Sequence, residues 1–280
     1  MEIFNSINEK KFSVLMSVYK NENPEFFCQA VESVMNNTVR PAEIVIVKDG
    51  KLPQRLENVC NKILTQYPRY IHFVPLKKNV GLGIALQRGL LECHYDLVAR
   101  MDTDDIAKPY RFEKQLKVFA HEASVDVCGG WIEEFSVDVE KIDNIRKVPE
   151  TTKEIYNFAK KRNPFNHMTV MFRKEAVIKV GSYQHFPLLE DYYLWFRMII
   201  NKCRMYNIQE ILCSVRTGKS MIARRGGLSY FKNEKKLYDC FYKQGYISAG
   251  EYITTLTERF IARIAPKEVR ALMYRLFLRG

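Results

Sequence analysis

The chain has 280 residues, of which 47% are hydrophobic and 27% charged, and its formal net charge is +12. This length buries a large core, as one α/β domain or a domain with an appendage, and the composition excludes a disordered or fibrous chain. The seven scattered cysteines lack the paired spacing of a zinc site, so we expect free thiols. Because no apolar run approaches the roughly 20 residues of a membrane span, we expect a cytoplasmic protein.

The first hundred residues alternate between strand and helix patterns. Continuous β-branched and apolar runs predict strands buried on both faces, at 12–18, 43–49, 71–76 and 96–101. Apolar residues at helical spacing predict intervening helices at 24–37, 53–66 and 83–93. The first helix has Asn23 as its expected N-cap and Pro24 at its first position. This alternation predicts half of a doubly wound parallel sheet.

The remaining chain has a looser pattern. We expect helices at 110–122 and 190–200, strands at 125–135, 168–172 and 206–215, and helical structure over 227–280. Segment 216–280 contains 14 Lys or Arg but only 5 Asp or Glu. Such a surplus attracts anions, namely nucleic acid, phosphate groups or an acidic membrane surface.

Polar side chains gather where the predicted strands end. They are Ser17, Tyr19, Asp49 and an acidic triplet consisting of Asp102, Asp104 and Asp105. Ligands of open α/β sheets bind beyond the carboxyl ends of the strands, so these side chains are expected at one shared edge.

The acidic triplet needs a positive partner, because neighbouring carboxylates repel one another. Mg²⁺ or Mn²⁺ is suited to that role, since either ion is usually held by one or two carboxylates together with substrate phosphates. The alternative is a solvated turn in which Asp105 caps the following helix.

With their neighbours included, these residues resemble glycosyltransferase family 2, inverting enzymes of the GT-A fold that use nucleotide-diphosphate sugars. The similar segments are, in chain order, "FSVLMSVYKNE", "AEIVIVKDG", "NVGLGIALQRGL" and "MDTDDIAKPYRFEKQ". Three later segments are similar to bacterial O-antigen and exopolysaccharide transferases of the amylovoran type: "NPFNHMTVMFRKEAV", "LLEDYYLWFRM" and "RRGGLSYFKNEKKLY". The ordered set is more specific than any single motif.

The resemblance implies an α/β GT-A fold with a mostly parallel, Rossmann-like sheet flanked by helices. We expect a catalytic domain over 1–215, with a nucleotide-sugar-binding half (1–105) and an acceptor-binding half (106–215). A basic helical extension is expected over 216–280.

The resemblance also implies a donor site at the carboxyl edge of the sheet. The residues implied in binding the sugar nucleotide are Ser17, Tyr19, Asp49, Asn79, Gly81, Leu82, Asp102 and Asp104. Asp49 would accept a hydrogen bond from uracil N3–H, and Gly81 would leave room for the ligand. Lys48 stands where the family usually has Asp, and Gln87 where Asn is common, so the contacts to the base can differ in detail.

The same resemblance assigns the metal ligands and the base. Asp104 is implied most directly as a ligand of Mn²⁺ or Mg²⁺, with Asp102 beside it and Asp105 either joining them or anchoring the loop. Asp191 matches the family's catalytic base, which takes the acceptor hydroxyl proton during inversion. The alternative is that Asp191 and Glu190 occupy the first turn of a helix, where acids favour the dipole, and Glu190 is the less favoured base.

Other residues keep two interpretations each. His167 contacts the diphosphate or shapes the acceptor pocket, or it is a satisfied structural histidine. Trp131 is a stacking platform for a sugar, or a core side chain. Arg224 and Arg225 clamp a phosphate of the donor or of a lipid-diphosphate acceptor, or they lie in a solvated basic loop.

We therefore expect a metal-dependent transferase that moves a sugar from a UDP-sugar to a polyprenyl-diphosphate-linked saccharide in bacterial O-antigen, capsule or exopolysaccharide synthesis. The QxxRW motif of processive synthases is absent, which favours addition of a single sugar. The alternatives are a nucleotidyltransferase, although no glycine-bearing loop follows the first strand, and a basic nucleic-acid-binding module, although no such signature is present and no nucleic-acid partner is expected.

The basic tail also carries an apolar stripe with two interpretations. It lies on an anionic membrane surface, which would make the enzyme peripheral at the inner face of the plasma membrane. Alternatively the stripe packs on the protein's own core, or on a second copy in a homodimer.

Overall fold

The computed structural model describes residues 10–217 and 226–265. One mixed sheet has the strand order β3-β2-β1-β4-β8-β6-β9-β5, and β7 pairs with β6 beside this path. The strands are β1 (Phe12–Val18), β2 (Glu43–Lys48), β3 (Ile71–Pro75), β4 (Leu97–Arg100), β5 (Ile106–Ala107), β6 (Val127–Phe135), β7 (Asn144–Arg146), β8 (Met171–Arg173) and β9 (Met205–Arg216).

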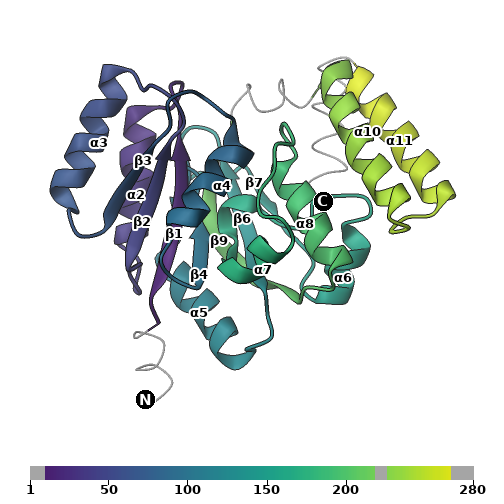
Figure 1. The fold of residues 1–280 in the computed structure, drawn as a ribbon, viewed down its shortest axis with the longest axis horizontal. Helices are drawn as coiled ribbons and strands as arrows, with labels where there is room; N and C mark the ends of the chain where they lie inside the picture. The colour runs from purple at the N-terminus through teal and green to yellow at the C-terminus, as the bar shows by residue number, and fades with distance from the viewer. Residues whose placement is uncertain (1–9, 218–225, 266–280) are drawn as a thin grey trace.

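Helices cover both faces of this sheet (Figure 1). They are α2 (Pro24–Met35), α3 (Gln54–Gln66), α4 (Leu82–Glu92), α5 (Arg111–His121), α6 (Thr152–Phe158), α7 (Lys174–Lys179), α8 (Glu190–Ile200), α10 (Gly227–Lys243) and α11 (Ala249–Ile264), with a 3₁₀ helix η1 at His167–Thr169. Within the two described ranges, no helix combines the length and the hydropathy needed to cross a membrane.

The four amino-terminal strands form the predicted parallel half-sheet. β1 pairs in parallel with both β2 and β4, and β2 pairs in parallel with β3. Each helix between these strands begins within a residue or two of its predicted start, and Asn23 caps α2 by accepting from the N–H groups of Glu25 and Phe26. The carboxyl ends of β1, β2 and β4 therefore meet at one edge, as the alternation predicts.

The second half of the sheet is mixed. β8 runs antiparallel to β4, β6 runs antiparallel to β8, and β9 runs parallel to β6. The strand predicted at 168–172 begins instead as η1, because the Thr169 hydroxyl donates to the Asn166 carbonyl at 2.7 Å and accepts from the Gly130 N–H at 3.1 Å. These local bonds compete with sheet pairing, so β8 begins only at Met171.

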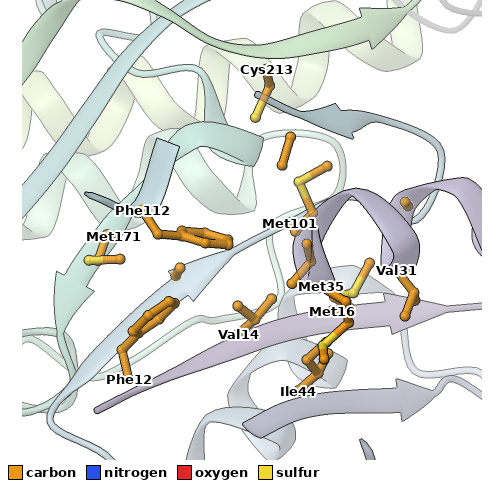
Figure 2. Close-up of a cluster of buried hydrophobic side chains, with 14 of the residues drawn as sticks. Phe12, Val14, Met16, Val31, Met35, Ile44, Met101, Phe112, Met171 and Cys213 are labelled. Atoms are coloured by element: carbon orange, nitrogen blue, oxygen red, sulfur yellow. The ribbon is translucent and has the colours of Figure 1, made fainter. Parts of the chain in front are cut away.

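Alternating residues of β1 contribute to two hydrophobic cores, one on each face of the sheet. Phe12, Val14 and Met16 pack with α2, α3 and α5. Figure 2 shows these three side chains with Val31 and Met35 of α2 and Phe112 of α5. Leu15 packs with the other core, which includes residues of α4, α6, α7, α8 and α10. Successive side chains of a strand point to opposite faces, and here both faces are buried. This segment is therefore a continuous apolar run.

The α10–α11 hairpin lies at the end of the molecule opposite α3 (Figure 1). Leu237, Tyr238 and Phe241 of α10 share a core with α8. Glu234 of α10 is only 4% exposed, and its carboxylate binds two arginines of α11. Arg263 donates to it through Nε at 2.8 Å and Nη2 at 2.7 Å, and Arg259 through Nη1 at 3.2 Å. Both arginines belong to the basic segment 216–280, and both are directed inward toward Glu234.

We expect Glu234→Ala to lower the free energy of unfolding by about 3–5 kcal/mol, because it leaves Arg259 and Arg263 without their counter-ion in a buried site. Urea unfolding followed by circular dichroism measures the change. Glu210→Ala is the matched control, since Glu210 pairs with Lys114 at the surface and such a pair contributes about 0.2–1 kcal/mol. Equal losses in the two variants would contradict the buried role.

Candidate active site

The acidic triplet lies between β4 and β5, at the predicted edge of the sheet. Its three residues can each offer a carboxylate oxygen, and these oxygens lie within 4.8 Å of one another. Asp102 and Asp104 are partly exposed, whereas Asp105 is buried. Hard oxygen donors in this arrangement suit Mg²⁺ or Mn²⁺.

The positive charge beside the triplet comes first from the protein itself. Arg100, the last residue of β4, is 2% exposed and forms an ion pair with Asp102. Its Nε and Nη1 atoms are buried without a hydrogen-bond partner among the described residues. Arg100 was not predicted as a site residue, although an arginine inside the apolar run "DLVARM" is a signal that could have identified it.

One arginine does not balance this cluster. Burial, followed by the charges of Asp102 and Glu22, raises the pKa of Asp104 to about 7. Burial and the charges of Asp104 and Asp102 raise the pKa of Asp105 well above its ordinary value. The donor set therefore fits a divalent cation, because a bound dication would neutralise the remaining carboxylate charge.

Asp105 has a defined structural contact. One of its carboxylate oxygens accepts a hydrogen bond from the Arg216 backbone N–H at 3.0 Å, at the end of β9. Asp105 was considered as a metal ligand or as an anchor of the loop, and this hydrogen bond is a contact of the anchoring kind.

Asp49, directly after β2, is 4% exposed and organises the segment that precedes α4. Its carboxylate accepts hydrogen bonds from Asn79 Nδ2 at 2.9 Å and from the N–H groups of Val80 at 2.7 Å and Gly81 at 3.1 Å. Three of about four acceptor positions of this carboxylate are thus occupied by the protein. Any hydrogen bond to a base would use the remaining one.

Glycines shape the same segment. Gly81 has φ +84°, a conformation that other residues rarely adopt, and a Cβ added there would meet nothing within 4 Å. Gly50 has φ +86°, and a Cβ there would lie 2.7 Å from the Asn79 nitrogen. The structure therefore brings the ends of β2 and β3 together and leaves open space at Gly81, as expected for a ligand approaching the backbone.

The other predicted donor residues lie around this edge. Ser17 is partly exposed near the end of β1, opposite Val47 of β2, and Tyr19 follows the strand with 38% exposure. Leu82 is partly exposed at the first position of α4. Arg224 and Arg225 lie outside the described residues.

Asp191 and Glu190 occupy the first turn of α8, which spans the predicted 190–200. Asp191 accepts hydrogen bonds from Asn163 Nδ2 at 2.6 Å and from the Tyr192 N–H at 2.7 Å. Burial raises the pKa of Asp191, and the Asn163 hydrogen bond opposes that rise. Burial and the charge of Asp191 raise the pKa of Glu190 to about 7. Both residues remain partly exposed.

His167 lies in a buried cluster with Tyr183. Its Nε2 atom is 2.9 Å from the Tyr183 hydroxyl, which was not predicted as part of the site. Burial and then the charge of Arg100 lower the pKa of His167 well below its ordinary value, so the imidazole is neutral. This surrounding agrees with the structural interpretation of His167 and places it near Arg100.

Trp131 is only partly buried. Its Nε1 atom donates to the Val148 carbonyl at 3.2 Å, and the Lys147 ammonium lies 4.9 Å from its ring centroid. The lysine thus covers part of the ring that the stacking interpretation would use.

Without metal, Asp104→Asn is expected to be more stable than the wild type, by a margin that grows as the pH rises. Because the pKa of Asp104 is raised in the folded state, its favourable contribution is present below about pH 4 and is lost as the pH approaches 7. Thermal unfolding with EDTA at pH 5.5 and pH 8 measures the difference in Tm between the variant and the wild type. His167 is present in both proteins, so its effect on Tm cancels in this difference. An advantage no larger at pH 8 than at pH 5.5 would refute this expectation.

Comparison with known proteins gives consistent matches. Residues 13–186 match the family model described as Glycosyl transferase family 2. The UDP-Gal:alpha-D-GlcNAc-diphosphoundecaprenol beta-1,3-galactosyltransferase of Escherichia coli is 38% identical over 271 residues, covering 96% of this chain and 97% of the relative. The amylovoran biosynthesis glycosyltransferase AmsE of Erwinia amylovora is 39% identical over 266 residues, covering 94% and 97%.

A solved structure shares the fold. S. aureus TarS 1–349 in complex with UDP-GlcNAc matches with a TM-score of 0.65 and 16% identity, over 96% of this chain and 76% of that one. The predicted GT-A fold class is thereby confirmed.

Proposed function

The chain belongs to glycosyl transferase family 2, and from that premise we propose that it moves one sugar from a UDP-sugar to a polyprenyl-diphosphate-linked saccharide with inversion. The observation that carries this proposal is the arrangement at the carboxyl edge of the sheet. There the Asp49-bound segment follows β2 and the acidic triplet follows β4, two strands that both pair in parallel with β1, and Asp191 is held in the first turn of α8. A nucleotide diphosphate needs the first two features, and an inverting transfer needs the third.

Different residues bind different parts of the sugar nucleotide. Asp49 fixes the backbone beside Gly81, and the open space there suits the ribose and diphosphate. Arg100 holds Asp102 in place through their ion pair, whereas Asp104 forms no ion pair with any other described residue. Mn²⁺ or Mg²⁺ held by Asp104 and Asp102, with Asp105 behind them, would stabilise the negative charge that develops on the leaving diphosphate.

Asp191 acts on the acceptor. Its carboxylate takes the proton of the acceptor hydroxyl while that oxygen attacks the anomeric carbon from the face opposite the diphosphate. A bond from the acceptor oxygen to the anomeric carbon forms, and the bond from that carbon to the diphosphate oxygen breaks. UDP leaves with the electron pair, so a second acid is unnecessary.

The acceptor class follows from the E. coli relative, whose name specifies a diphosphoundecaprenol-linked substrate. An apolar stripe on α11 is suited to the membrane that would carry such a lipid, or to a second copy of the chain. Ile253, Ile261 and Ile264 are 62%, 59% and 50% exposed and share one side of the helix.

An assay of UDP release tests the proposal. Individual UDP-hexoses and UDP-N-acetylhexosamines are supplied with Mn²⁺ or Mg²⁺ and a polyprenyl-diphosphate saccharide. We expect one donor to yield UDP and an extended lipid in an acceptor-dependent reaction. Release of pyrophosphate would instead support the nucleotidyltransferase alternative, against which the family match now argues.

A further inference from the structure

The carboxylate of Asp191 is held from two sides by groups that can only donate. Asn163 Nδ2 donates to one oxygen at 2.6 Å, and the Tyr192 backbone N–H donates to the other at 2.7 Å. Each oxygen therefore has a fixed partner and keeps further lone-pair capacity. This arrangement leaves the carboxylate able to accept a hydroxyl proton.

The amide of Asn163 has a defined orientation. Its Oδ1 accepts the Phe165 N–H at 3.3 Å, which requires the amide nitrogen to face Asp191. Pro164 follows and restricts the Asn163 backbone to extended conformations. The Asn163 carbonyl in turn accepts from Arg146 Nη2 of β7 at 2.8 Å. The Phe165 N–H therefore orients the side-chain amide, while Pro164 and Arg146 hold the backbone that carries it.

We propose that Asn163 is a positioning residue for the transfer reaction: its side-chain amide orients the Asp191 carboxylate toward the acceptor hydroxyl and keeps it a proton acceptor. This inference rests on the proposed function, in which Asp191 is the base. The amide achieves this because it donates a strong hydrogen bond to the ionised carboxylate and has no charge or titration of its own.

Charged groups surround Asp191. Arg100 and Arg146 lower its pKa, and its own charge raises the pKa values of Glu190 and Tyr183. Burial opposes ionisation most strongly, and among the groups that lower the pKa of Asp191 the Asn163 amide has the largest effect. Removal of this one side chain should therefore be visible in the pH dependence of the reaction.

The test compares pH profiles of kcat/KM for the wild type, Asn163→Ala and Asn163→Asp. The free energy of a hydrogen bond to a charged group corresponds to a pKa change of about one to two units. Asn163→Ala should therefore raise the pKa of Asp191 by that amount, and kcat/KM should fall about 10- to 100-fold at pH values below the new pKa. Asn163→Asp keeps the shape but removes the donor, and should shift the profile at least as far. The KM for the donor and the calorimetric affinity for UDP should stay at wild-type values.

Asn207→Ala is the matched control. Asn207 Nδ2 donates to the carbonyls of Pro149 at 2.7 Å and Pro164 at 3.2 Å, so its removal loosens the same loop without touching Asp191. We expect its pH profile to remain in place. If Asn163→Ala fails to bind UDP, Asn163→Asp decides the test, because it preserves side-chain volume.

The outcomes separate the two proposals. Unshifted profiles in both Asn163 variants, with Asp191→Asn inactive, would overturn the role of Asn163 alone. Wild-type turnover in Asp191→Asn would instead remove Asp191 as the base and the proposed mechanism with it.

Discussion

Replacing Asp191 by Asn is expected to reduce kcat by about 10²–10⁴-fold, the contribution typical of a positioned general base. The amide of Asn cannot take the proton of the attacking hydroxyl. Asp191 lies in the first turn of α8, apart from the acidic triplet between β4 and β5, so the affinity for UDP should not change. Single-turnover transfer and calorimetry with UDP measure the two quantities separately.

Glu190→Gln is the control for this substitution, because Glu190 is the adjacent carboxylate and its pKa is raised to about 7. It lacks the two fixed donors that hold Asp191, and we expect a much smaller loss of kcat. The reverse pattern, with Asp191→Asn active and Glu190→Gln inactive, would assign the base to Glu190.

Replacing Asp104 by Asn is expected to abolish transfer for a different reason. It removes the carboxylate that the structure leaves freest to bind a metal. The affinity for Mn²⁺ should fall by at least about 10- to 100-fold, since mutating residues that merely support metal ligands already has that effect. Stabilisation of the protein by Mn²⁺ together with UDP, measured as a shift in Tm, should then disappear.

Asp105→Asn distinguishes the two roles considered for Asp105, namely metal ligand and anchor of the chain. The amide oxygen can still accept the Arg216 N–H, so the anchor at the end of β9 remains while one negative charge is lost. We expect Mn²⁺ and UDP to stabilise this variant nearly as well as the wild type. Loss of that stabilisation would make Asp105 a metal ligand.

Much of the fold follows from local patterns in the sequence. The strand at 12–18 and the helix at 190–200 have their predicted bounds, because a buried strand and an amphipathic helix each repeat a strong signal over several residues. The gathering of Asp49 and the acidic triplet at one edge also follows, since parallel strands present their carboxyl ends together.

Short elements and spatial partners could not be predicted. β5 has two residues and β7 three, which is too few for a recognisable period, and both exist through pairing with distant strands. Asn163 and Asp191 are 28 residues apart, and their hydrogen bond depends on tertiary packing. Arg100, by contrast, has a signal in the sequence, because it is a charged residue inside the apolar run of β4, but its ion pair with Asp102 follows only from the folded structure.

The proposed function depends on metal binding by the acidic triplet, and one calorimetric experiment tests that binding most directly. UDP is titrated into the wild-type protein in the presence of Mn²⁺ and, separately, of EDTA. We expect binding at least about tenfold tighter with Mn²⁺, because an ion held by the carboxylates of the triplet would neutralise charge on the diphosphate. Equal affinities under the two conditions would contradict the assignment of this site to a metal-bound sugar nucleotide.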